Sequence, residues 1–135
     1  MPHSVRPLDH RQIAVFLVYG VVVWFLAALL LRWLGPLGIY QGGLRLLVYL
    51  LIIPGTLPLV WLSARLAGTV PGQLFPGFTL ASAMAALCDG MALAWTPTLY
   101  GATTALHAGA GAMILWGLGV GIFLAYLWDR PARSG

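Results

Sequence analysis

Charged side chains are scarce in this sequence. Only 7% of its 135 residues are charged, and lysine and glutamate are absent. Soluble domains carry about 25% charged residues, so the composition excludes an ordinary soluble protein and indicates an integral membrane protein. Arginine outnumbers aspartate, but every charged residue except Asp89 lies at or near the end of an apolar segment. The positive charge therefore indicates membrane topology, and we expect no nucleic-acid partner.

Cysteine is nearly absent as well. Cys88 is the only one, which excludes an intramolecular disulfide and the cysteine spacings of structural zinc and thiol redox sites. We interpret Cys88 as a small apolar filler. The sequence also lacks a nucleophile paired with a base, a metal-binding cluster and a phosphate loop. We therefore expect no enzymatic activity, no metal and no cofactor.

Long apolar segments make up most of the chain, of which 61% is hydrophobic. They predict an all-α, polytopic membrane protein: a single domain over residues 1–135 with four transmembrane helices in a small antiparallel bundle. The expected helices cover about residues 11–34, 44–66, 78–96 and 103–128. Asp9 and Gln12 form a capping-box pattern at the start of the first helix. Its apolar core is too long for a cleaved signal peptide.

The second apolar segment contains two prolines, Pro54 and Pro58. Each proline removes one backbone donor, so the carbonyl groups of Leu50 and Pro54 lose their usual partners. In hydrocarbon such carbonyl groups need another donor. We expect this helix to be broken or kinked around Pro54 to Pro58.

Asp89 lies near the middle of the third predicted helix. A carboxylate there costs about 2.5–3.5 kcal/mol on insertion scales, so Asp89 must be protonated, paired or beside water. Small or polar residues recur at helical spacing on its side of the helix and predict a face packed on other helices. These residues are Ser82, Ala85, Ala92 and Thr96.

Asp89, Pro54 and Thr56 are predicted to form an intramembrane polar site, since they fall at similar depths. In a structural interpretation, a neutral Asp89 donates a hydrogen bond to the carbonyl groups that the prolines free. In a functional interpretation, the same groups form a proton or substrate site, as in transporters with discontinuous helices. The residues leave both open.

Two further features lie in the fourth predicted helix. Gly117, Gly121 and Ala125 recur at four-residue spacing and predict a close helix contact. His107 is flanked by small residues, which leaves room for a flat ring such as a tetrapyrrole. Haem with two histidine ligands needs a second histidine in the membrane, so an interfacial structural role is favoured over a tetrapyrrole or metal ligand.

Several motifs follow one another along the chain. They are Tyr19-Gly20 with Trp24 and Arg32, the prolines of the second helix, Asp89, and Leu115-Trp116-Gly117 with Gly119. In this order they resemble an uncharacterised bacterial family of small four-helix inner-membrane proteins. The resemblance implies a shared fold, with the bacterial inner membrane as the expected location, and it carries over no activity, cofactor or site.

Arginine is unevenly distributed between the two ends of the predicted helices. Five arginines, against two, lie on the side that carries the N-terminus, the second connection and the C-terminus, so both termini are predicted to be cytoplasmic.

Two functions remain open. One is an accessory, structural or assembly subunit of a larger membrane complex. The alternative is a small proton-coupled transporter or channel that uses Asp89. Expected partners are the lipid bilayer and either other membrane subunits or further copies of the chain.

Overall fold

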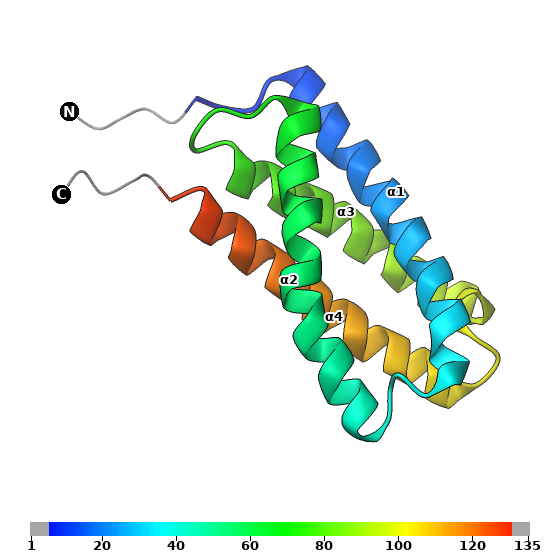
Figure 1. The fold of residues 1–135 in the computed structure, drawn as a ribbon. Helices are drawn as coiled ribbons and strands as arrows, with labels where there is room; N and C mark the ends of the chain where they lie inside the picture. Colours follow the sequence, from blue (N-terminus) through cyan, green and yellow to red (C-terminus); the bar gives the residue numbers. More distant parts are fainter. Residues whose placement is uncertain (1–5, 131–135) are drawn as a thin grey trace.

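The computed structural model describes residues 6–130, and this part of the chain is built from helices without any strand. The α-helices are α1 (His10–Leu34), α2 (Gly42–Ala67), α3 (Leu74–Trp95) and α4 (Thr104–Trp128), as Figure 1 shows. Two short 3-10 turns, η1 (Gly35–Leu37) and η2 (Pro97–Tyr100), follow α1 and α3. All four α-helices are long and apolar enough to cross a membrane. The predicted all-helical class is therefore confirmed for the described residues.

The start of α1 is fixed by local hydrogen bonds. The backbone N–H of Gln12 donates to the Asp9 carboxylate at 2.7 Å, and the backbone N–H of Asp9 donates to the Gln12 side chain at 3.0 Å. This is the predicted capping box, and it satisfies two backbone donors that the first turn of a helix leaves free. The Gln12 amide also donates to Gln73 at 2.9 Å and so ties α1 to the connection before α3.

The second helix is not interrupted as predicted, because α2 is one continuous helix with Pro54 and Pro58 inside it. A kink at these prolines stays a prediction. Pro54 and Pro58 are both exposed on the outer surface of the bundle. The two prolines are four residues apart and so lie on one face, which confines the lost donors to that face. The Thr56 hydroxyl donates to the carbonyl oxygen of Ile52 at 2.6 Å, within the same stretch.

Helix α3 begins at Leu74, four residues before its predicted start at residue 78. Pro76 lies in the first turn, where a missing N–H group costs no intrahelical hydrogen bond. Asp129, just after α4, accepts hydrogen bonds from the backbone of Gly72 at 2.8 Å and of Phe75 at 2.9 Å. A carboxylate at a helix start is favoured by the helix dipole. The end of α4 therefore stabilises the early start of α3.

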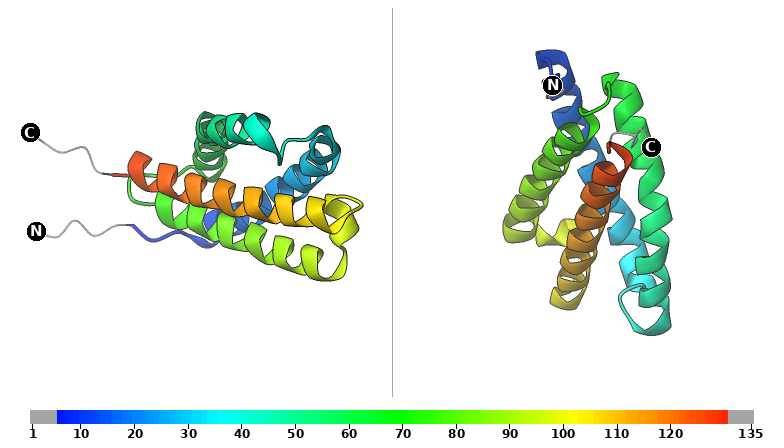
Figure 2. Two further views of the ribbon diagram at one scale, coloured as in Figure 1. Left: turned by 90° about the horizontal axis from the view of Figure 1, so that it is seen from below. Right: turned by 90° about the vertical axis from the view of Figure 1, so that its left-hand side faces the viewer.

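The helices pack in the order α1, α3, α4 and α2, while α1 and α2 touch each other little (Figure 2). The closest approach is between α1 and α3 at Gly20, where a Cβ atom would overlap the backbone carbonyl group of Ala81. Small residues allow such backbone contact between membrane helices. The bundle is thus tight around α3 and loose between α1 and α2.

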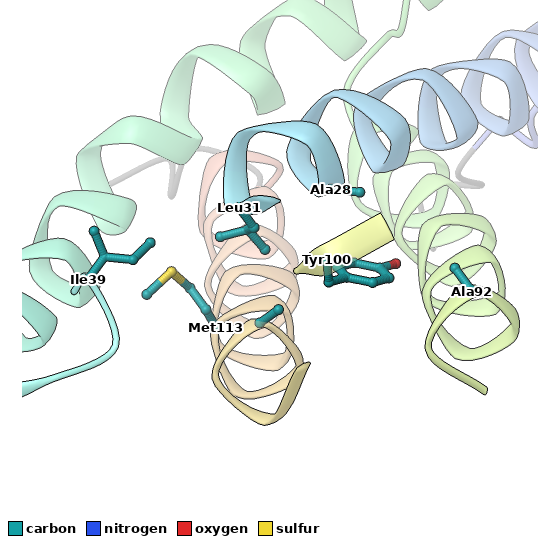
Figure 3. Close-up of a cluster of buried hydrophobic side chains, with 7 residues drawn as sticks. Ala28, Leu31, Ile39, Ala92, Tyr100 and Met113 are labelled. Atoms are coloured by element: carbon teal, nitrogen blue, oxygen red, sulfur yellow. The ribbon is translucent and has the colours of Figure 1, made fainter. Parts of the chain in front are cut away.

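A cluster of buried side chains closes the end of the bundle near η1 and η2. Tyr100 of η2 is fully buried in it and lies between α1, α3 and α4 (Figure 3). The cluster consists of Ala28, Leu31, Ile39, Ala92, Tyr100, Ala110 and Met113. Packing of Tyr100 in this cluster brings its hydroxyl group inward, toward α3.

Candidate functional site

Asp89 lies in the interior of the bundle and is only 8% exposed. Ser82, Ala85 and Ala92 are buried on the same side of α3, whereas Thr96 is exposed at its end. Because α3 starts early and ends at Trp95, Asp89 lies six residues, or about 9 Å along the axis, from its end. The carboxyl group is therefore closer to the η2 end of the bundle than the sequence predicts.

The partner of Asp89 is Tyr100. The tyrosine hydroxyl donates to Asp89 Oδ1 at 2.5 Å and accepts a hydrogen bond from Trp24 Nε1 at 3.0 Å. An indole N–H can only donate, so the hydrogen bonds run in one direction, from Trp24 through Tyr100 to Asp89. Burial, and next the hydrogen bond to Asp89, raise the pKa of Tyr100 above its ordinary value. The phenol therefore keeps its proton and remains a donor.

This arrangement differs from the predicted hydrogen bond between Asp89 and α2. Thr56 is buried, but its hydroxyl donates to its own helix, and Pro54 is exposed. Asp89 has no hydrogen-bond partner on α2 in the part of the chain that the structure describes. Tyr100 is not among the predicted site residues, because it lies in the connection after α3 and outside the membrane helices. The available signal was a tyrosine eleven residues after Asp89, in a connection with no charged residue.

A cavity of about 420 Å³ lies beside Asp89, at the centre of the bundle. All four α-helices contribute to its wall, which is mostly apolar. Asp89 provides the only carboxyl group of the wall. The other polar side chains that line it are Tyr19, Trp24, Thr56 and Ser82. Volumes of about 300–1,000 Å³ and a few polar groups in an apolar wall are typical of small-molecule sites.

The cavity exists because the facing sides of α1 and α2 do not meet. Ala27 of α1 and Gly55 of α2 both line it and are exposed, and a Cβ atom at Gly55 would meet nothing within 4 Å. Leu30 and Leu51 also line it, yet they are 53% and 56% exposed. Cavity-lining residues that remain exposed mark an opening, so the cavity opens sideways between α1 and α2.

The predicted packing residues of α4 lie in two environments. Ala125 is fully buried, and Gly121 is buried where a Cβ atom would crowd Phe78 of α3 and Thr56 of α2. Gly117 instead lines the cavity, and a Cβ atom there would meet nothing within 4 Å. The small-residue spacing of α4 thus allows close packing at one end and leaves space at the other.

His107 faces the connection before α4. Its Nε2 lies 2.8 Å from the carbonyl oxygen of Gly101. A ring nitrogen that donates to a carbonyl group carries a proton and is not available to a metal. Among residues 6–130 there is no group of three side chains that could hold a metal ion. The contact holds the His107 ring against the connection before α4.

Comparison of the chain with protein-family models, with curated proteins and with solved structures finds no match in any of the three.

Proposed function

We propose that this chain is a non-enzymatic membrane protein that acts as an accessory or assembly subunit, with the outer face of α3 packed on a partner helix. The supporting observation is a row of small exposed residues along α3: Ala83, Ala86, Gly90 and Ala94. A Cβ atom at Gly90 would meet nothing within 4 Å. Lipid gains little from small side chains, whereas a second helix can approach them closely.

Large apolar side chains such as Phe25, Leu26 and Leu46 are exposed along α1 and α2, as expected for contact with lipid chains. On α3, Leu87, Met91 and Trp95 are exposed beside the small residues. In this proposal the partner helix lies over the small residues of α3, and these larger side chains flank it. The partner is another membrane subunit, with a second copy of this chain as the competing possibility.

Purification in a mild detergent, with the native mass measured, tests this proposal. We expect a complex of fixed stoichiometry that Gly90→Leu disrupts. Gly43→Leu is the matched control, since Gly43 also lies in a helix with open space around it. A monomeric chain, or a complex that survives Gly90→Leu, would refute the proposal. A complex made only of this chain would replace the accessory role with a homo-oligomer.

A second candidate function is proton-coupled transport. It is favoured by one observation, that the only carboxyl group of the cavity wall belongs to Asp89. In this case Asp89→Asn should fold normally and abolish a pH-dependent flux in reconstituted vesicles. An absence of flux from the unsubstituted protein would remove this candidate.

We also propose that the membrane is the bacterial inner membrane and that both termini are cytoplasmic. Arg6, Arg11, Arg65 and Arg130 lie at the end of the bundle where α1 starts and α4 ends; Arg133, which the prediction also counted, lies outside the described residues. Arg32 and Arg45 lie at the opposite end. Positive charge is enriched on the cytoplasmic side of membrane proteins. Reporter fusions after Arg65 and after Pro97 test the orientation, and cytoplasmic activity of the second fusion would contradict it.

A further inference from the structure

The cavity between α1 and α2 has the form of a site for one chain-like molecule. On α2 it extends from Val48 to Leu59, which corresponds to about 16 Å at the helical rise. This length is about half of a hydrocarbon core of about 30 Å, and so about one leaflet. The cavity volume of about 420 Å³ is within the range of about 300–1,000 Å³ that small-molecule sites occupy. The length and the volume together fit one hydrocarbon chain.

The polar groups of the cavity differ in what they already bind. Tyr19 and Thr56 line the wall, but their hydroxyl groups donate to the carbonyl oxygens of Leu59 and Ile52. Ser82 lines the wall one turn from Phe78. Asp89 is the last residue of α3 in the wall, Trp24 lies in the facing wall, and apolar residues such as Leu34 and Ile39 continue the wall beyond them. A molecule that fits has a hydrogen-bonding group beside Asp89 and is otherwise apolar.

The carboxyl group can accommodate such a polar end. Tyr100 donates to Oδ1 of Asp89, and the indole of Trp24, which donates to the Tyr100 hydroxyl, also lies close to this carboxyl group. A carboxylate has room for about four hydrogen bonds on its two oxygens. A buried carboxylate with few donors is expensive in hydrocarbon, so a further donor that arrives from the bilayer binds favourably there.

We propose that this cavity binds a single-chain bilayer amphiphile with an uncharged hydroxyl head, whose hydroxyl donates to Asp89 and whose tail lies along the apolar wall. The molecule enters sideways from the lipid through the opening at Ala27 and Gly55. A fatty acid of the same length is disfavoured, because its carboxylate faces a second carboxyl group. The site is separate from the outer face of α3 on which the proposed function rests.

Binding of tritiated 1-dodecanol to the purified full chain in phosphatidylcholine nanodiscs tests the proposal, with dodecane as the probe that lacks the hydroxyl group. We expect saturable binding of one dodecanol per chain and weaker binding of dodecane. Gly55→Leu fills the cavity from a position with open space, so it should abolish saturable binding. Gly43→Leu makes the same change outside the cavity wall and should bind as the unsubstituted protein does.

Asp89→Leu tests the polar end of the site. The preference for dodecanol over dodecane should fall by about tenfold, while dodecane binding persists and shows that the cavity is intact. Three results would overturn the proposal: no saturable binding to the unsubstituted chain, full binding to Gly55→Leu, or an unchanged preference in Asp89→Leu. Loss of a native protein complex in Gly55→Leu would also overturn it, because the opening would then hold a partner helix.

Discussion

Removal of one oxygen atom, in Tyr100→Phe, should measurably destabilise the bundle. The phenol is fully buried, donates to Asp89 at 2.5 Å and accepts from Trp24 at 3.0 Å. Phenylalanine has nearly the same shape, so packing in the cluster around η2 is retained. The substitution therefore isolates the two hydrogen bonds.

The magnitude follows from the environment of these bonds. A hydrogen bond to a charged group contributes about 1.5–3 kcal/mol in soluble proteins, but interhelical bonds in a membrane average about 0.6 kcal/mol and reach about 1.7. The membrane values apply here, because Asp89 and Trp24 lie within spanning helices. Loss of both bonds should then cost about 1–3 kcal/mol. Trp24→Phe breaks one bond and should cost less, about 0.5–1.5 kcal/mol of hydrogen bonding.

The free energy of unfolding can be measured by titration of mixed micelles with a denaturing detergent, followed by circular dichroism. Asp89→Asn is the control, since its side-chain carbonyl oxygen still accepts from Tyr100 and stability should be nearly unchanged. Asp89→Ala removes the acceptor and should cost about 0.5–2 kcal/mol. A double-mutant cycle between Tyr100→Phe and Asp89→Ala should give a coupling of about 0.5–1.7 kcal/mol.

The same measurements can refute the interaction between Tyr100 and Asp89. If Tyr100→Phe costs the same in the presence and absence of the Asp89 carboxyl group, the two side chains do not interact. If Asp89→Asn destabilises as much as Asp89→Ala, a neutral acceptor at this position does not stabilise the bundle through Tyr100. Either result would remove the proposed role of Tyr100 as the partner of Asp89.

Three further predictions follow from single contacts. Gly20→Leu should prevent folding or cost more than about 3 kcal/mol, because the leucine side chain would overlap the backbone of Ala81, which cannot move aside. The amount of folded protein recovered in detergent measures this effect, and near-normal stability would contradict the close contact. Asp129→Ala should cost about 0.5–2 kcal/mol, because the two hydrogen bonds to the backbone at the start of α3 are lost. Hydrogen exchange of the backbone N–H groups of Gly72 and Phe75 should become faster. Unchanged exchange at these two residues would contradict the prediction. The pKa of Tyr100 is raised in the folded state, so the unfolded chain loses the Tyr100 proton at a lower pH than the folded chain does. The free energy of unfolding should therefore fall as the pH rises above about 10. Tyr100→Phe should make this fall in stability shallower, and an identical pH profile in the variant would argue against the raised pKa.

The sequence by itself determined the helices. Their apolar segments are long enough to span a membrane, and helix formation depends on residues only three or four positions apart. For the same reason the capping box of Asp9 and Gln12 was predictable. The burial of Asp89 also follows from local spacing, because the small residues on its side of α3 recur with the helical period.

Only the tertiary structure decided which side chains of different helices meet and where space remains between the helices. The partner of Asp89 comes from η2, a turn whose folding back onto α1 and α3 no local spacing encodes. The early start of α3 depends on Asp129, which lies 54 residues beyond Phe75 in the chain. The cavity arises because α1 and α2 do not pack against each other, and the space at Gly55 becomes part of a cavity only because α1 lies opposite it. Such features depend on contacts between distant segments, and these are set by how whole helix faces pack.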